Sequence, residues 1–293
     1  MKYIYCEPYS GFNDTLSQIQ KAWEYARATG RALVINTLPY SSMRRHFDEY
    51  FTVTDDSLKV FPRLTPPLLK HLEELSTYPK SMQGRLRSYV PVWSEELECV
   101  IDSVTQTPLE LDFTREYAED VVVHASAGGY DPVELLGSIQ LKKDLARSFA
   151  ERLKVLGGDY CAVHVRNTDY RTNYKAFFLK LAPFVKGRTL LVCSDDWKCK
   201  EVAARMFPES NVISLTEIPQ LADGKPLHLT RQTDKDKDNL DMLLDFVGLA
   251  GAAELYPAPV DKLGEPGGFG RLVDYLNQRK DIYKHFFLDA ALD

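Results

Sequence analysis

The chain has 293 residues, of which 44% are hydrophobic and 27% are charged, and its formal net charge is −6. This length suits one large α/β domain or two ordinary ones, and the composition is that of a globular protein. The negative charge argues against non-specific binding to nucleic acid, which needs a basic surface. No apolar run approaches the roughly 20 residues of a membrane span, and the first residues do not read as a signal peptide.

The chain opens with a predicted strand–helix–strand unit. A strand over 2–6 leads through a loop to a helix over Thr15–Thr29 and a second strand over 32–36. The helix has apolar residues at helical spacing, Asp14 is placed to cap its first turn, and Gly30 is placed to end it in the left-handed conformation. We expect this βαβ unit to start a parallel sheet.

The middle of the chain is less regular. The stretch 37–109 carries prolines and aromatic residues, with helical character only around Pro67–Leu75. A short apolar strand over Val121–Val123 follows. The pattern then predicts one long amphipathic helix over Leu135–Leu156, closed by two glycines.

The strand–helix alternation restarts after that helix. Its elements are a strand over 160–166, a strand over Thr189–Asp196, a helix over Trp197–Phe207, a strand over Asn211–Leu215, a solvated charged loop over 223–239, an apolar helix near Leu240–Leu249, a strand over 252–258 and a last helix from about Arg271.

This repeated alternation favours an α/β protein with two Rossmann-like domains that face a central cleft. The interruption near residue 140 divides the chain into domains 1–140 and 141–293, with the last helix a candidate to pack back on the first domain. Five cysteines, an odd number without metal-ligand spacing, are typical of a reducing compartment. We therefore expect a cytoplasmic protein.

The segment VHVRNTDY, Val163–Tyr170, carries the strongest functional signal. Side chains alternate along a strand, so His164 and Arg166 share a face near its carboxyl end, where open α/β sheets bind ligands. A buried parallel strand is normally apolar on both faces, and a guanidinium there suits a nucleotide diphosphate. The alternatives are an Arg166–Asp169 pair that ties strand to loop, and a hydrogen-bonded core histidine at position 164.

VHVRNTDY resembles the H-x-R-R-x-D segment of the fucosyltransferase superfamily, which includes the α1,6-, α1,2- and protein O-fucosyltransferases. The opening segment GFNDTLSQIQKAWEYARATGRALVI is similar to the first βαβ unit of the rhizobial nodulation fucosyltransferases. The resemblance implies a GT-B fold whose second domain holds the donor. It also implies an inverting, metal-independent transfer of L-fucose from GDP-fucose to a hydroxyl of a glycan acceptor, and a role in microbial oligosaccharide or polysaccharide synthesis.

The resemblance assigns roles to single residues. Arg166 matches the arginine that binds the donor β-phosphate and stabilises the leaving diphosphate, and His164 and Asp169 match positions that support it. Asn167 stands where the family has a second arginine. Tyr174 stands where the α1,6 enzymes have a glutamate that is a base candidate, so Asp14 and Asp169 are the candidate bases here.

Two further turns are candidate donor contacts. Where the family has a serine-rich turn that holds phosphate, this chain has Gly267, Gly268, Phe269 and Gly270, followed by the cation of Arg271. Glycine allows close approach, and a helix N-terminus offers N–H groups to an anion. A flexible turn is the alternative. At the end of the neighbouring strand, Ser194, Asp195 and Asp196 either contact the ribose or base of the donor or cap the next helix.

The first domain contributes the loop of Gly11, Phe12, Asn13 and Asp14. In the family, the residue at Asn13 or beside it contacts the donor or the acceptor, so we take Gly11, Phe12 and Asn13 as contacts and Asp14 as a base or a helix cap. His124, at the end of a predicted strand, is an acceptor-side or base candidate.

Two other functions stay open. One is a GT-B enzyme for another nucleotide sugar, such as a Kdo, rhamnose or heptose donor, which the missing second arginine and serines leave open. A non-catalytic nucleotide- or glycan-binding protein of the same fold is the other alternative. A dehydrogenase is disfavoured, because no G-x-G-x-x-G motif opens either first helix.

Overall fold

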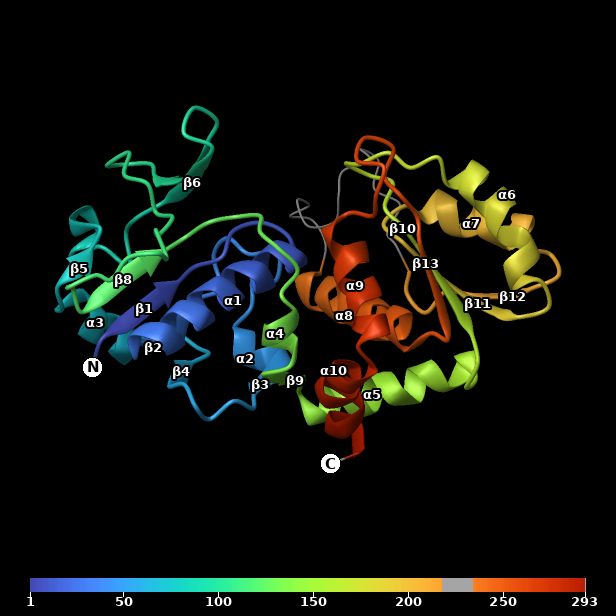
Figure 1. The fold of residues 1–293 in the computed structure, drawn as a ribbon, viewed down its shortest axis with the longest axis horizontal. Helices are drawn as coiled ribbons and strands as arrows, with labels where there is room; N and C mark the ends of the chain where they lie inside the picture. Colours follow the sequence, from blue (N-terminus) through green and yellow to red (C-terminus); the bar gives the residue numbers. More distant parts are fainter. Residues whose placement is uncertain (218–233, 293) are drawn as a thin grey trace. The chain divides into compact units, whose positions relative to one another are not determined.

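The computed structural model describes residues 1–217 and 234–292. It divides the chain into two compact units, Met1–Gln140 and Leu141–Asp293 (Figure 1). Both units are built from parallel strands and helices, which confirms the predicted α/β class. Residues 223–233 of the predicted charged loop lie outside the described residues.

The first unit is built on a parallel five-stranded sheet with the order β4-β2-β1-β8-β5. The strands are β1 (Tyr3–Cys6), β2 (Ala32–Ile35), β4 (Val60–Phe61), β5 (Thr77–Tyr78) and β8 (Val121–His124). The chain adds β2 and β4 on one side of β1, and β8 and β5 on the other. The strand order therefore reverses at β1, and the carboxyl end of such a strand is where open α/β sheets usually bind ligands.

The first helix, α1 (Phe12–Thr29), starts three residues earlier than predicted. Gly11 is its N-cap, with an extended backbone and no side-chain cap, so the prediction that Asp14 caps the helix is wrong. Asp14 instead lies in the first turn, where a carboxylate stabilises the helix dipole. Gly30 ends the helix with a φ of 66°, which confirms the predicted left-handed stop.

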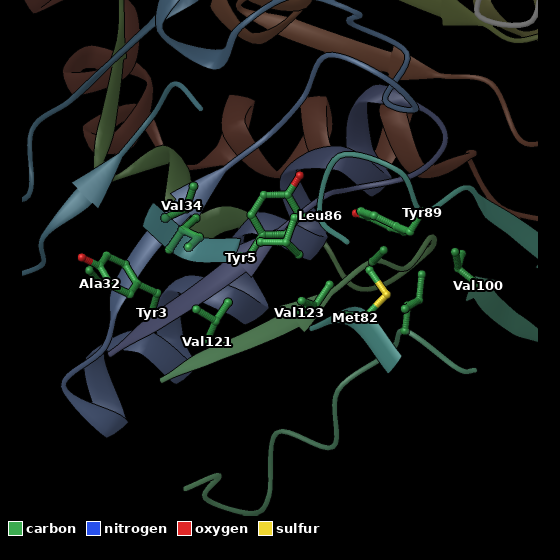
Figure 2. Close-up of a cluster of buried hydrophobic side chains, with 13 residues drawn as sticks. Tyr3, Tyr5, Ala32, Val34, Met82, Leu86, Tyr89, Val100, Val121 and Val123 are labelled. Atoms are coloured by element: carbon green, nitrogen blue, oxygen red, sulfur yellow. The ribbon is translucent and has the colours of Figure 1, made fainter. Parts of the chain in front are cut away.

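One face of this sheet carries the core of the first unit (Figure 2). Tyr3 and Tyr5 of β1, with their neighbours on β2 and β8, pack against Met82, Leu86 and Tyr89 of the segment that follows strand β5. All of these side chains are buried, and apolar burial of this kind is the main stabilising contribution to a fold. This core packs against one face of β1 up to Tyr5, near the carboxyl end of the strand.

The remaining elements of the first unit are short. They are α2 (Phe47–Tyr50), β3 (Phe51–Val53), α3 (Pro66–Glu73), the 3₁₀ helix η1 (Lys80–Met82), the antiparallel pair β6 (Pro91–Ser94) and β7 (Cys99–Asp102), α4 (Val133–Leu136), and β9 (Ile139–Leu141), which pairs with β3. The predicted helix near Pro67–Leu75 is confirmed as α3.

The predicted long helix over Leu135–Leu156 is wrong. The chain forms α4, turns at Gly137, runs through the strand β9 and re-enters a helix only at α5 (Lys143–Leu153). Ile139 and Leu141 are buried while Gln140 between them is half-buried, which is the alternation of a strand. A helical spacing of apolar residues on both sides hid this short strand.

The second unit is built on a parallel four-stranded sheet with the order β12-β11-β10-β13. The strands are β10 (Cys161–Val165), β11 (Thr189–Ser194), β12 (Asn211–Ile213) and β13 (Glu254–Pro257). The strand order reverses at β10, because β11 and β12 lie on one side and β13 on the other. All four strands fall within segments predicted as strands.

Helices cover both faces of this sheet (Figure 1). The buried residues of one face of β10 pack with α6 (Tyr174–Val185) and α7 (Trp197–Met206), and the other face packs with α8 (Lys235–Gly251) and α9 (Gly268–Gln278). The unit also contains α5, η2 (Lys154–Leu156), α10 (Lys280–Tyr283), a π-helical turn η4 (Lys284–Asp289) and α11 (Ala290–Leu292), which contacts α5.

Other helices of the second unit also differ from the prediction. The helix α6 was not anticipated. The helix α8 starts at Lys235, because the Asp234 side chain accepts hydrogen bonds from the amides of Asp236 and Lys237, so the end of the predicted charged loop is helical. The helix α9 starts at Gly268, which places most of the glycine-rich turn inside its first turn.

Candidate functional site

Arg166 directly follows β10, at the carboxyl end of the strand where the order of the second sheet reverses. Its Nε donates to Oδ1 of Asp169 at 2.9 Å, and its Nη2 donates to Oδ2. The guanidinium lies 4.8 Å from the centre of the Tyr170 ring. The predicted Arg166–Asp169 pair is therefore present, and it holds the guanidinium in one orientation while the Arg166 side chain keeps 24% of its surface exposed.

The start of helix α9 lies against this arginine. A Cβ atom at Gly267, the N-cap of α9, would be 3.5 Å from Cδ and 3.7 Å from Nη1 of Arg166. The first N–H groups of a helix have no acceptor within the helix, and the helix dipole makes this end positive. Arg166 and the α9 N-terminus thus place a guanidinium beside the first N–H groups of a helix, an arrangement of the kind that binds phosphate. Arg271 lies one turn further, where its Nη1 donates to the carbonyl of Pro266 at 3.3 Å.

His164 packs against the first turn of the same helix, α9. A Cβ atom at Gly270 would lie 3.1 Å from Nδ1 of His164, so only glycine fits there without displacement. The ring of Phe269 lies 5.2 Å from the imidazole. Burial, with a smaller contribution from the charge of Arg166, lowers the pKa of His164 to about 4. The imidazole is therefore neutral at physiological pH. This agrees with the alternative given above, in which His164 is a histidine of the core.

Asn167 connects two loops. It is buried; its backbone N–H donates to Oδ1 of Asp195 at 2.7 Å, and its side-chain amide donates to Oδ2 of Asp196 at 2.8 Å. Its Oδ1 accepts from the backbone N–H of Thr172 at 3.1 Å. Through these contacts Asn167 positions the loop that carries Arg166. The resemblance expects a second donor-binding arginine at this position.

The three residues after β11 are also engaged. Asp196 caps α7 by accepting from the N–H of Lys198 at 2.9 Å, which confirms the capping alternative, and its N–H donates to the Ser194 hydroxyl at 3.1 Å. Asp195 also accepts from the Thr168 hydroxyl at 2.6 Å. Burial raises the pKa of Asp195 from its ordinary value. The donor-contact alternative for these residues is still a prediction.

Gly11, Phe12 and Asn13, the other candidate contacts of the first unit, lie at the start of α1. Gly11 is the N-cap of α1, and Phe12 and Asn13 are buried. The Oδ1 of Asn13 is buried and accepts no hydrogen bond from any residue in the described ranges. A buried hydrogen-bond acceptor without a partner is unusual in a folded protein. This oxygen could accept a hydrogen bond from a hydroxyl group of a ligand.

His124 does not suit the role predicted for it. It is fully buried; its Nε2 lies 2.8 Å from the Gln18 side-chain oxygen, and its Nδ1 accepts from the N–H of Leu111 at 3.2 Å. Burial lowers the pKa of His124 to about 3, so its neutral form is strongly favoured. With both ring nitrogens used, His124 is a structural residue of the first unit. A position at the end of a strand does not by itself distinguish a catalytic histidine from a structural one.

The sequence reasoning missed one acidic residue, Glu7. It follows β1 by one residue, at the carboxyl end of the strand where the order of the first sheet reverses, and it is 3% exposed. An acidic residue directly after an apolar strand was the available signal.

No helix in the described part of the chain is long and apolar enough to cross a membrane. The same residues contain no group of three or more histidine, cysteine, aspartate or glutamate side chains that could hold a metal ion.

The two units with parallel sheets have the GT-B fold, the fold of many glycosyltransferases, as the solved structures that resemble this chain do. The particular structures that resemble this chain are those of the α-1,6-fucosyltransferase NodZ. A NodZ crystal soaked with GDP-fucose matches with a TM-score of 0.61 and 18% identity over 94% of this chain and 92% of that one. NodZ co-crystallised with GDP matches with a TM-score of 0.59 and 17% identity over the same shares. NodZ from Bradyrhizobium matches at 0.58 and 16% identity over 94% and 93%.

No family model and no curated protein sequence matches the chain. At this level of identity the likeness shows the fold. The fucosyltransferase-like fold that the two sequence segments predicted is therefore confirmed.

Proposed function

We propose that this protein is an inverting glycosyltransferase that transfers L-fucose from GDP-fucose to a hydroxyl of a glycan. The second unit, 141–293, holds the nucleotide sugar, and the first unit, 1–140, supplies the acceptor side. The observation that carries the proposal is the position of Arg166 beside the N-terminus of α9, at the strand where the second sheet reverses. The fold supports it, because the similar NodZ structures were obtained with GDP and GDP-fucose.

Arg166 would stabilise the charge that grows on the diphosphate as the sugar leaves. The salt bridge to Asp169 orients the guanidinium before the donor arrives, and the amides of Gly268 and Phe269 at the start of α9 add fixed dipoles. A preorganised donor group of this kind contributes roughly 3–4 kcal/mol to catalysis. Both oxygens of Asp169 accept from Arg166, so Asp169 supports the arginine better than it serves as a base.

The acceptor and the cell compartment belong to the same proposal. A microbial oligosaccharide or polysaccharide is the acceptor class that the resemblance suggests. The cysteines Cys6, Cys99, Cys161, Cys193 and Cys199 are all free thiols, which supports the proposed location in the reducing cytoplasm.

The test measures thermal unfolding with GDP, UDP, CMP and NAD. A ligand that binds only the folded state stabilises it by mass action, by about 2.7 kcal/mol at one hundred times its Kd, so GDP should raise Tm by several degrees and the other nucleotides by less. Arg166→Ala should remove the GDP shift. Arg188→Ala is the matched control, because Arg188 of the same unit pairs with Glu254 and Asp159 and not with the proposed site.

Two results would contradict the proposal in different ways. Stabilisation by UDP or CMP in place of GDP would favour another nucleotide sugar on the same fold. A GDP shift that survives in Arg166→Ala would remove the role of the arginine. Release of GDP from GDP-fucose in the presence of a sugar acceptor separates an enzyme from a nucleotide-binding protein.

A further inference from the structure

A cluster of buried polar side chains lies at the carboxyl end of β1, in the first unit. Its members are Tyr5, Glu7, Asn36 and Tyr89, each at least 94% buried. The Tyr5 hydroxyl donates to Oε2 of Glu7 at 2.8 Å, and the Asn36 amide donates to the same oxygen at 2.6 Å. Figure 2 shows the hydroxyl ends of Tyr5 and Tyr89 directed into the same space.

Three polar atoms of this cluster have no hydrogen-bond partner in the described ranges. They are Oε1 of Glu7, Oδ1 of Asn36 and the hydroxyl of Tyr89. Buried polar atoms are nearly always paired in folded proteins, so three unpaired ones around a single carboxylate need an explanation. Two of the three accept hydrogen bonds and the third can accept or donate, which is the complement of a ligand hydroxyl.

The place of the cluster in the sheet also points to a ligand. The N–H of Glu7 donates to the carbonyl of His124 at 2.8 Å, so Glu7 directly continues the pairing of β1 with β8, at the carboxyl end of the strand where the order of the sheet reverses. Beside it, the half-buried rings of Tyr9 and Tyr40 stack at 5.9 Å. Aromatic faces next to polar atoms suit a ligand with apolar and hydroxyl surfaces, such as a pyranose.

We propose that Glu7 accepts the proton of the attacking acceptor hydroxyl, a role that rests on the proposed glycosyl transfer. The O–H bond of the acceptor breaks and its proton moves to Oε1 of Glu7. The acceptor oxygen forms the bond to C1 of the fucose, and the bond from C1 to the diphosphate breaks, with its electron pair leaving on GDP. Oε1 of Glu7 is buried, so the acceptor hydroxyl reaches it only when a neighbouring side chain moves aside.

The ionisation of the cluster agrees with this role. Burial, partly offset by hydrogen bonds such as those from the Tyr5 hydroxyl and the Asn36 amide, raises the pKa of Glu7 to about 7, and a general base works best with a pKa near the working pH. The titratable groups that face Glu7 are Tyr5, Cys6, Tyr40 and Tyr89. Burial raises the pKa of each of these four groups, so none of them gains or loses a proton near pH 7.

The test compares Glu7→Gln with the wild type for release of GDP from GDP-fucose, with a panel of mono- and disaccharides, between pH 5 and 9. The wild-type kcat/KM should rise with pH through an apparent pKa near 7. Glu7→Gln should lower kcat about 100-fold or more and remove that rise, while the Tm shift with GDP stays unchanged. Glu7→Asp, which keeps a carboxylate, should retain the pH dependence at a reduced rate.

Asp102→Asn is the matched control. Asp102 is also a fully buried carboxylate of the first unit, but Arg85 and Thr105 satisfy it. This control should keep the rise of kcat/KM near pH 7. A Glu7→Gln variant that shifts with GDP and retains its rate within threefold, or retains the pH-dependent rise, overturns the role of Glu7 and leaves the donor assignment standing. A wild type that shows no GDP shift overturns the donor assignment itself, and the proton-acceptor role with it.

Discussion

Replacing Glu7 by glutamine should stabilise the protein increasingly as the pH rises. Burial raises the pKa of Glu7 from 4.5 to about 7 on folding. A group whose pKa is higher in the folded state contributes stability that is fully present below the unfolded pKa and is lost as the pH rises through the folded one. Between pH 4 and pH 8 the wild type therefore loses roughly 3 kcal/mol at this site, because a pKa unit corresponds to about 1.4 kcal/mol.

Glutamine is neutral at every pH and does not share this loss. The difference in unfolding free energy between Glu7→Gln and the wild type should therefore grow by roughly 3 kcal/mol from pH 4 to pH 8. Urea unfolding followed by circular dichroism at half-unit pH steps measures the difference. A difference that stays constant over this range would show that Glu7 does not take up a proton on folding and would refute its raised pKa.

Asp102→Asn gives the opposite pH dependence and so checks the sign. Although burial acts against it, hydrogen bonds from Thr105 and Arg85 hold the pKa of Asp102 below its ordinary value of 3.8. The stability that Asp102 contributes is present above pH 3.8 and is lost as the pH falls through the folded pKa. The deficit of Asp102→Asn should therefore be largest near neutral pH and should shrink in acid.

The other predictions concern packing and buried hydrogen bonds in the two units. Gly270→Ala should lower stability by roughly 1–3 kcal/mol, because the new Cβ would lie 3.1 Å from the His164 ring; Gly267→Ala, whose nearest contact is 3.5 Å, should cost less than about 1 kcal/mol, and thermal unfolding compares the two. His124→Ala should cost at least about 2 kcal/mol in urea unfolding at pH 7, because it leaves two buried partners unpaired. Asn167→Ala should weaken the GDP shift while costing roughly 1–3 kcal/mol, because it releases the loop of Arg166; an unchanged GDP shift would show that the loop does not need this anchor.

Much of the fold could be predicted from the sequence because the parallel strands are nearly continuous apolar runs. The strands β1, β2, β10 and β11 and the helix α1 all lie where the pattern placed them, within a few residues at their ends. Runs of this kind leave little choice, since a buried parallel strand is apolar on both faces. The failures lie where two patterns compete over a few residues, as at β9, where a helical spacing concealed a three-residue strand.

The candidate site divides in the same way. His164 and Arg166 could be found because they lie within and directly after an apolar strand, where an ionisable side chain has an energetic cost that stands out in the sequence. The roles of Asn167 and His124 could not be found, because hydrogen bonds to Asp196 and Gln18 join residues 29 and 106 positions apart. Glu7 was missed for a related reason: its unusual state depends on burial by side chains distant in sequence.

The state of Glu7 itself argues that the first unit is not optimised for stability at this point. The carboxylate destabilises the fold by roughly 3 kcal/mol above pH 8, and the partners around it leave three polar atoms unpaired. A neutral or apolar residue would relieve the cost, and local conflicts of this kind are concentrated at functional sites. One variant therefore tests both halves of the argument, since Glu7→Gln should be more stable at pH 8 and slower in transfer. A variant that gains stability without losing activity would leave the buried carboxylate without the function proposed for it.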